Sequence, residues 1–349
     1  MINTEDPLVM TVASQPVDAP KSLFSSRRRT LILGTGQLAK ELGQVLVFET
    51  ATKYQVVGFL GADPTRIGER FVNPGIVGTY DELAKIVEQY NIDSIAICLE
   101  DRRSVLPVQV LLELKARGVD ITDGHHLFEE ASGRLAINSL RPSALIFSTG
   151  FHRRWISGVM KRIFDVLLSV LGLVIFLPLF ALIAVCIRLD SPGPVLYPQV
   201  RVGLGGRPFT MLKFRTMGHD AENVGPQWAQ ADDSRASRVG RWLRKTRLDE
   251  LPQFINVLRR DMSFVGPRPE RPCFVQELKK VIPYYDIRHT VSPGITGWAQ
   301  VRFRYAASEE DSHRKLEYDL YYVKNLSLLF DLRILFETIS VVLSGNGAR

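Results

Sequence analysis

The sequence predicts an α/β Rossmann-like N-terminal domain, followed by a mostly helical α+β domain that enters a membrane through a proline-broken re-entrant helix. Two observations support this: apolar strands alternate with helices in the first part, and an uncharged run of 22 residues opens the second. A length of 349 residues suits about two domains. We place a disordered lead-in at 1–27, the Rossmann-like domain at 28–150 and the membrane-associated domain at 151–349, with its re-entrant helix at about 160–189. The lead-in lacks the charged start and apolar core of a signal peptide.

The N-terminal prediction rests on short apolar runs separated by amphipathic segments. Strands are expected at residues 31–33, 54–61, 94–99 and 119–124, helices at 38–47 and 105–118, and a turn plus helix at 75–90. Strands that alternate with helices usually pair in parallel, so we expect a parallel sheet covered on both faces.

A glycine-rich turn, Gly34-x-Gly36-x-x-Ala39, joins the first strand to the first helix, which is the context that dinucleotide binding requires. The acid that should end the second strand and bind a ribose is replaced by Leu60-Gly61. Two interpretations follow: a weak CoA- or nucleotide-binding-like cofactor site at Gly34 and Gly36, or a tight turn in a regulatory or dimerisation domain. The second is favoured, because this turn alone is a weak signal.

Residues 166–187 carry no charge and would extend ~33 Å as a straight helix, enough to cross a hydrocarbon core of ~30 Å. Pro178 lies near the middle and removes a backbone donor there. Basic residues flank both ends, and positive charge favours the cytoplasmic side. These features suit a helix that enters, bends at Pro178 and returns. A plain spanning helix stays open as the alternative, because hydropathy does not separate the two.

The formal net charge of +7 indicates an anionic partner: nucleic acid, a phosphorylated metabolite or an acidic membrane surface. Nucleic acid is disfavoured, because no recognition helix or aromatic stacking platform accompanies the basic residues. The three cysteines are far apart and form no CxxC, so neither a disulfide framework nor a zinc site is indicated.

Four arginines recur at every third residue shortly before an acidic pair: Arg235, Arg238, Arg241 and Arg244. Such a run is most often a solvated basic face, and acids like Asp249 and Glu250 near a helix start most often complement its dipole. A sharper interpretation is that the arginines lower the pKa of Asp249, which is then ionised and available as a nucleophile or metal ligand. A diphosphate substrate would fit, because arginines bind its non-reacting oxygens and Mg2+ neutralises the rest.

Long motifs of the second part occur in a fixed order: "KRIFDVLLSVLGLVIFLPLF", "SPGPVLYPQVRVG", "FTMLKFRTM", "RVGRWLRKTRLDELPQFINVLRRDMSFVGPRPE", "RHTVSPGITGWAQV" and "KLEYDLYYVKNLSLLFDLRILFETI". Over about residues 158–349 they resemble the bacterial sugar transferase family, the monotopic phosphoglycosyl transferases, and the ending is similar to its exopolysaccharide branch. The resemblance implies an enzyme that begins exopolysaccharide, capsule or O-antigen assembly. It also implies a re-entrant helix broken at a proline, in agreement with the independent prediction at Pro178.

The resemblance implies transfer of a sugar 1-phosphate from a UDP-sugar to undecaprenyl phosphate, with release of UMP. It makes Asp249 the nucleophile of a phosphosugar-aspartyl intermediate and places Mg2+ at Asp249 and Glu250. Phosphate or nucleotide contacts carried over by motif are Lys213, Arg215, Arg244, Arg268, Arg304 and Asp319. Before Arg304 this chain has "RFRYAAS" where many relatives have "NGRN", which changes the local backbone and bears on sugar preference.

The resemblance further implies the bacterial inner membrane and an active site on its cytoplasmic face. We expect no nucleic-acid partner, and an N-terminal domain that regulates the enzyme or forms a homodimer. Two other functions stay open: a membrane-anchored NAD-dependent sugar-nucleotide oxidoreductase or epimerase, and a non-catalytic nucleotide-sensing scaffold. The first is disfavoured, because no Tyr-x-x-x-Lys pair follows the glycine turn.

Overall fold

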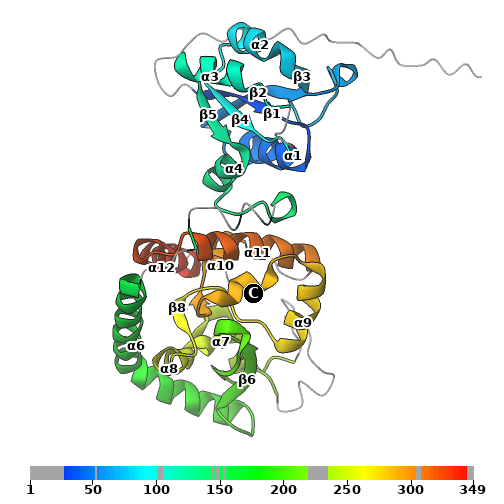
Figure 1. The fold of residues 1–349 in the computed structure, drawn as a ribbon. Coiled ribbons are helices and arrows are strands. Elements are labelled where there is room, and N and C mark those ends of the chain that lie inside the picture. Colours follow the sequence, from blue (N-terminus) through cyan, green and yellow to red (C-terminus); the bar gives the residue numbers. More distant parts are fainter. Residues whose placement is uncertain are drawn as a thin grey trace, which may run out of the picture.

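The computed structural model contains an N-terminal α/β domain and a larger, mostly helical domain with one long helix (Figure 1). It describes residues 27–51, 53–100, 105–140, 142, 145, 150–151, 155–218, 235–303 and 308–343. The predicted lead-in, apart from Arg27, lies outside the described residues, and so does Arg304.

The N-terminal domain is built on a five-stranded sheet in the order β3-β2-β1-β4-β5, with every pair parallel. Its strands are β1 Arg28–Leu33, β2 Tyr54–Gly61, β3 Ile76–Thr79, β4 Ser94–Ile97 and β5 Asp120–Asp123. Its helices are α1 Gln37–Gln44, α2 Leu83–Tyr90, α3 Val108–Ala116 and α4 Gly124–Ser132. The predicted parallel sheet is confirmed.

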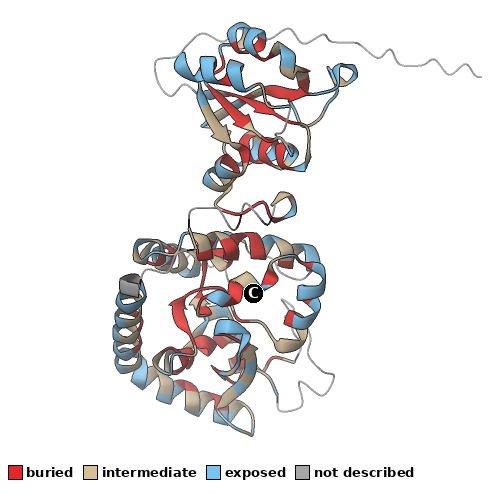
Figure 2. Ribbon diagram, viewed as in Figure 1, coloured by how far each residue is buried: buried red, intermediate tan, exposed pale blue. Residues whose placement is uncertain are grey.

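Side chains of β1 alternate between two apolar cores, as the two-residue period of a strand requires. Leu31 and Leu33 pack with residues of α2 and α3, whereas Ile32 packs with residues of α1 and α4. Figure 2 shows these strands as the buried centre of the domain. The prediction of helices on both faces is therefore confirmed.

One strand is missing from the prediction. The sequence indicates only a turn before the helix at 75–90, but Ile76–Thr79 forms the edge strand β3 and pairs with β2. Ile76 and Gly78 point to the buried face, and Ile86 of α2 packs closely against Gly78. Because glycine is depleted in strands, this short segment carries no clear strand pattern.

The C-terminal domain has the predicted mostly helical α+β composition. Its helices are α6 Trp155–Asp190, α7 Arg238–Thr246, α8 Gln253–Leu258, α9 Pro272–Val281, α10 Trp298–Arg302, α11 Glu309–Lys324 and α12 Leu328–Leu343. Strands β6 Leu196–Val202 and β7 Pro208–Phe214 form an antiparallel hairpin, and β8 Ser263–Val265 pairs in parallel with β9 Gly294–Thr296.

Helix α6 is the one described helix that is long and apolar enough to cross a membrane, over Gly158–Asp190. It continues through Pro178, and Figure 1 shows it changing direction along its length. Large apolar side chains are exposed along it, among them Leu167, Val174 and Leu177, which would be costly in water. The surface suits lipid; the re-entrant path itself stays a prediction.

A buried cluster of polar side chains connects α6 to the rest of the domain. The Lys161 ammonium donates to Asp331 Oδ2 at 2.7 Å and to the Val265 carbonyl at 3.0 Å. The Tyr322 hydroxyl donates to the other oxygen of Asp331 at 2.7 Å. One carboxylate, 1% exposed, therefore joins α6, α11 and α12.

The two domains are in contact through α4 and the segment that follows it. The Trp298 indole donates to the Gly133 carbonyl at 2.7 Å, and the Lys324 ammonium lies 2.6 Å from Glu129 Oε2. Trp298 and Glu129 are largely buried by these contacts. The N-terminal domain is therefore seated on α10 and α11.

Replacing Lys161 by methionine should strongly destabilise the protein. The change leaves the Asp331 charge buried without its cation, at a cost of about 3 kcal/mol, or roughly 6 °C or more in the thermal midpoint. Scanning fluorimetry in detergent measures it. Arg117→Met, which removes an exposed pair with Glu88, is the matched control and should shift the midpoint little. Adding Asp331→Asn to Lys161→Met should recover part of the loss, and equal shifts for both single variants would contradict this account.

Candidate active site

The acidic pair lies on a single 3-10 turn, Leu248–Glu250, between α7 and α8. Arg247 adopts a left-handed backbone with φ of 61° and ends α7, and Pro252 begins α8 with a φ of −60° that its ring fixes in advance. The turn places Asp249 and Glu250 inside the domain, 7% and 8% exposed. A buried carboxylate is stable as an anion only when cations or hydrogen-bond donors lie close to it, and otherwise it binds a proton.

Glu250 takes most of the available positive charge. Arg268 donates to both of its oxygens, at 2.6 Å and 3.4 Å, in a bidentate pair. Lys213 Nζ is 3.4 Å and Arg247 Nη1 3.8 Å from Oε1 of the same carboxylate. Burial alone would raise the pKa of Glu250, but Arg268 and Lys213 overcome it and hold the pKa well below its usual value. Glu250 is thus a fixed anion.

Asp249 has a different environment from its neighbour. Within the described part of the chain its carboxylate accepts no hydrogen bond, and its nearest cation is Lys213 Nζ at 4.0 Å. Burial therefore dominates and raises the pKa of Asp249, against the opposing effect of Lys213. Arg268 and Arg247 also lower this pKa, but burial outweighs them, so the expected net lowering is wrong; both guanidinium groups pair with Glu250 and not with Asp249. Asp249 therefore carries the less stabilised of the two charges.

Lys213 is held beside the acidic pair by a buried amide. Asn256 of α8 accepts from the Leu212 backbone N–H at 2.9 Å and donates to the Thr210 carbonyl at 2.7 Å, which fastens α8 to β7. Asn256 is fully buried, and no sequence signal distinguished it from a surface amide. Burial also lowers the pKa of Lys213. The position of the Lys213 ammonium is therefore set largely by the β7 backbone, which Asn256 holds against α8.

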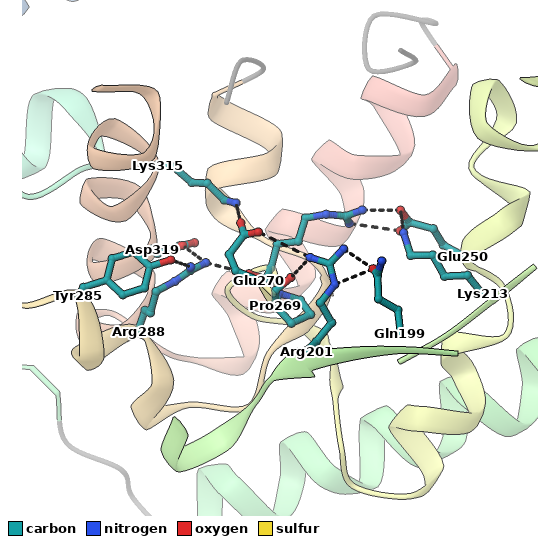
Figure 3. Close-up of polar contacts among 11 residues, drawn as sticks. Gln199, Arg201, Lys213, Glu250, Pro269, Glu270, Tyr285, Arg288, Lys315 and Asp319 are labelled. Carbon is teal, nitrogen blue, oxygen red and sulfur yellow. Dashed lines mark hydrogen bonds and ion pairs between the residues drawn. The ribbon is translucent and has the colours of Figure 1, made fainter. Parts of the chain in front are cut away.

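A second charged group supports the Arg268 loop, and Figure 3 shows the two groups side by side. Arg288 donates to the Arg268 carbonyl at 2.8 Å and to the Tyr285 hydroxyl at 2.7 Å, while Asp319 lies 2.8 Å from Arg288. Asp319 is 1% exposed. It therefore contacts the Arg268 loop through Arg288, and its predicted substrate contact stays a prediction.

Glu270 completes this second group and was not singled out from the sequence. It pairs with Lys315 of α11 and lies 3.6 Å from Arg201 Nη1 of β6. Burial opposes its ionisation, but Lys315, Arg288 and Arg201 hold the pKa of Glu270 at about 2. The glutamate directly follows the "GPRP" run, and that adjacency was the available signal.

The remaining residues predicted to contact phosphate do not lie together at the acidic pair. Arg215 lies at the end of α6, where it donates to the Ser191 carbonyl at 2.6 Å and the Pro192 carbonyl at 3.0 Å. Its guanidinium thereby binds carbonyls of the turn that follows α6 and, in the described part of the chain, makes no ion pair with the acidic pair, so its predicted phosphate contact stays a prediction. Arg244 lies half-buried on α7, one turn before the pair, and Arg304 is outside the described residues.

The glycine turn of the N-terminal domain has a packing explanation. Gly34 has φ of +129°, and a Cβ there would lie 2.5 Å from the Cys98 carbonyl oxygen. A Cβ on Gly36 would lie 2.5 Å from the Glu100 carboxylate. The close approach of the Cys98 backbone and the Glu100 side chain accounts for both glycines without a ligand. The weakly predicted cofactor site therefore gains no support from this geometry.

A small apolar pocket of about 160 Å³ opens beside the acidic pair. Glu250 and Arg247 are at one end, and Phe254, Val301 and Val342 contribute apolar walls from α8, α10 and α12. The pocket thus joins the charged site to the apolar helices.

The acidic pair offers few protein ligands for a divalent cation. Among the described residues no group of three or more His, Cys, Asp or Glu side chains is arranged to hold a metal. Mg2+ commonly takes one or two carboxylates and completes its shell with water and substrate phosphates. Asp249 fits that role, because its oxygens accept no hydrogen bond from described residues, whereas Glu250 is occupied by Arg268.

Comparison with known proteins gives consistent matches. A family model described as bacterial sugar transferase matches residues 156–345. The chain is 51% identical over 190 residues to UDP-N-acetylgalactosamine-undecaprenyl-phosphate N-acetylgalactosaminephosphotransferase of Aeromonas hydrophila, covering 54% of this chain and 45% of that protein. It is 34% identical over 325 residues to undecaprenyl-phosphate glucose phosphotransferase of Komagataeibacter xylinus, covering 89% and 58%.

A third relative is UDP-glucose:undecaprenyl-phosphate glucose-1-phosphate transferase of Escherichia coli K12, 40% identical over 186 residues, covering 53% of this chain and 40% of that protein. The chain spans about half the length of these curated relatives. The Komagataeibacter alignment extends over the N-terminal domain as well.

The two neighbouring acids should respond oppositely to neutralisation. Asp249→Asn should raise the thermal midpoint at pH 7 by roughly 2 °C, because a carboxylate whose folded-state pKa is raised opposes folding at any pH above its unfolded pKa. Glu250→Gln should lower the midpoint by roughly 5 °C, because Arg268 loses its anion.

Differential scanning fluorimetry between pH 4 and 8 measures both changes. The gain from Asp249→Asn should fade as the pH approaches the value for unfolded aspartate, about 3.9, where both states bind the proton. Glu88→Gln, at an exposed carboxylate paired with Arg117, is the matched control and should change the midpoint little at any pH. A loss of stability in Asp249→Asn equal to that in Glu250→Gln would refute the assignment of charges.

Proposed function

This chain belongs to the bacterial sugar transferase family, and from that premise we propose that it transfers a sugar 1-phosphate from a UDP-sugar to undecaprenyl phosphate, releasing UMP. The names of the three relatives contain undecaprenyl phosphate and differ in the sugar. In this proposal the product is the first membrane-bound intermediate of exopolysaccharide, capsule or O-antigen synthesis. The observation that carries the proposal is the unequal acidic pair: Glu250 bound by cations, and Asp249 free to react.

Asp249 acts as the nucleophile. One of its oxygens attacks the β-phosphorus of the UDP-sugar, forming an aspartyl–phosphorus bond, while the bond from that phosphorus to the bridging oxygen breaks and UMP leaves. A phosphate oxygen of the lipid then attacks the same phosphorus and breaks the aspartyl–phosphorus bond. The product is a lipid diphosphate sugar, and Asp249 returns to its ionised form.

The surrounding cations stabilise the charge that the two anions bring together. Lys213 lies 4.0 Å from Asp249 Oδ2, close enough to contact a phosphoryl oxygen that Asp249 attacks. Arg268 is fixed by Glu250 and by the support of its backbone from Arg288, so its positive charge is held beside the acidic pair. Mg2+ held by Asp249 and substrate phosphates would supply further charge neutralisation.

The membrane context suits a lipid acceptor. The exposed apolar surface of α6 is placed to lie in lipid, and the pocket from Phe254 to Val342 offers an apolar wall beside the acids. In this arrangement the enzyme sits at the cytoplasmic face of the inner membrane, with α6 entering and leaving on one side. The N-terminal domain then has a regulatory or dimerising role.

The two alternative functions have less support. A nicotinamide cofactor is not needed to explain the glycine turn, because Gly34 and Gly36 are already required by the close approach of Cys98 and Glu100. A non-catalytic scaffold gives no reason for a buried, weakly solvated carboxylate beside Lys213 and Arg268.

UMP release from UDP-sugars tests the proposal. Purified protein with undecaprenyl phosphate and Mg2+ is offered UDP-glucose, UDP-galactose and the two UDP-N-acetylhexosamines. We expect one donor to be favoured, release to need Mg2+ and lipid phosphate for continuous turnover, and Asp249→Asn to lose at least 1,000-fold in rate, an order of magnitude typical of a lost nucleophile. Asp286→Asn controls for handling. Turnover that survives Asp249→Asn would exclude this mechanism.

The pH dependence should report Asp249 directly. As pH falls through its raised pKa, Asp249 gains a proton and kcat/KM for the UDP-sugar declines, at a pH above that of free aspartate, about 3.9. Lys213→Gln removes a neighbouring positive charge, so the decline should move to higher pH in addition to any loss of rate. Lys279→Gln, at an exposed lysine, should leave the profile unchanged. A decline that stays in place or moves to lower pH in Lys213→Gln would contradict the assignment.

A further inference from the structure

A cavity of about 520 Å³ lies between the two domains, away from the acidic pair. The N-terminal domain contributes residues of α1 and α4, and the C-terminal domain contributes the end of α9 and one side of α11. Figure 1 shows α1 and α4 on the side of the N-terminal domain that faces α11. The volume falls within the range of small-molecule sites, about 300–1,000 Å³.

The cavity wall is strongly acidic. Five of its lining residues carry carboxyl groups, from three different segments: Glu41, Glu49, Glu309, Glu310 and Glu317. Two guanidinium groups oppose them, and one of these, on Arg134, is already 3.2 Å from Glu49. Negative charge is therefore in excess on this wall.

Glu317 has one carboxylate oxygen that is buried without a hydrogen bond. Its residue is 4% exposed, its Oε2 atom accepts no hydrogen bond, and the cations nearest to it among the described residues, Arg134 Nε and Arg314 Nη1, are both 3.7 Å away. Arg134 Nε and His313 Nε2, on the same wall, are also without hydrogen bonds within the described chain. Buried polar atoms are normally paired, and each unpaired one costs about 1–3 kcal/mol. Three of them on one cavity wall give a bound ligand polar groups to satisfy.

The surroundings of Glu317 keep its carboxyl neutral. Burial raises the pKa of Glu317 to about 8, Glu41 and Glu49 add to this effect, and Arg134 opposes it. His313 on the same helix is neutral as well, because burial lowers its pKa. A cation placed against Glu317 would replace its proton and satisfy the orphaned oxygen at once.

We propose that this inter-domain cavity binds a small organic cation carrying ammonium or guanidinium groups, which bridges Glu317 of α11 to Glu41 of α1. The apolar surface of Phe128 and Ile282 would cover the methylene part of such a molecule, while the carboxylates receive its N–H donors. The binding is independent of the transfer reaction proposed above.

Helix α11 gives this site a physical connection to the acidic pair. Glu317 and His313 face the cavity, whereas Lys315 and Asp319 hold Glu270 and Arg288 beside Arg268. A ligand that fixes the N-terminal domain against α11 therefore acts on the helix that supports the Arg268 loop.

Isothermal titration calorimetry of the full chain in detergent tests the site with putrescine, spermidine and agmatine, and with 1,4-butanediol as the neutral counterpart of putrescine. We expect saturable binding of at least one cation and none of the diol. Proton release should accompany binding at pH 7.5, seen as a dependence of the heat on buffer ionisation enthalpy. Repeating the titration on Asp249→Asn separates this result from the proposed transfer reaction.

Glu317→Gln and Glu41→Gln should each weaken binding at least tenfold, while Glu88→Gln, at an exposed pair with Arg117, should not. Glutamine resembles the neutral form of Glu317, so folding should be preserved. Gln44→Lys, which brings an ammonium group to the cavity wall, should also block the probes. The proposal is overturned if no cation binds, if the diol binds as well, or if the affinity is unchanged in the cavity variants.

Discussion

The ion pair between Glu250 and Arg268 is the interaction on which the rest of the site depends. It joins the turn between α7 and α8 to the loop after β8, with a bidentate contact of 2.6 Å and 3.4 Å. Lys213 from β7 approaches the same carboxylate, so three separate segments meet at one anion. The outer supports, Arg288 with Asp319 and Lys315 with Glu270, hold the Arg268 loop in place. Because these partners are buried, they act with little solvent screening.

This pairing leaves the adjacent carboxylate without a partner of its own. Asp249 shares the burial of Glu250 but not its guanidinium, so the folded chain holds one stable anion and one whose charge it opposes. Two identical chemical groups are thereby given different properties by position alone. Burying the Asp249 charge lowers the folding stability, and Asp249 is the residue proposed to react. Reactive sites commonly reduce the stability of the protein in this way.

The sequence predicted what depends on local pattern. Alternating strands and helices identified the parallel sheet, the uncharged run identified α6, and the motifs identified the acidic pair and its family. Strand β3 was missed because it is short and contains Gly78. The lower pKa expected at Asp249, and the phosphate contact expected of Arg215, depended on which arginine reaches which acceptor. These pairings depend on how distant segments pack in the folded chain, which local sequence patterns do not show. The same holds for the contacts of Asn256 with Thr210 and of Arg288 with Asp319.

The most direct test of the unequal pair is to trap and locate the covalent phosphosugar intermediate. Protein incubated with its UDP-sugar and Mg2+, without lipid phosphate, is quenched and its peptides are mapped by mass spectrometry. The account predicts a hexose-phosphate or N-acetylhexosamine-phosphate mass on the peptide containing Asp249 and Glu250, with fragmentation placing it on Asp249, and its absence in Asp249→Asn. A modification on Glu250, or UMP released without any adduct, would contradict the assignment of Glu250 as the fixed anion and Asp249 as the nucleophile.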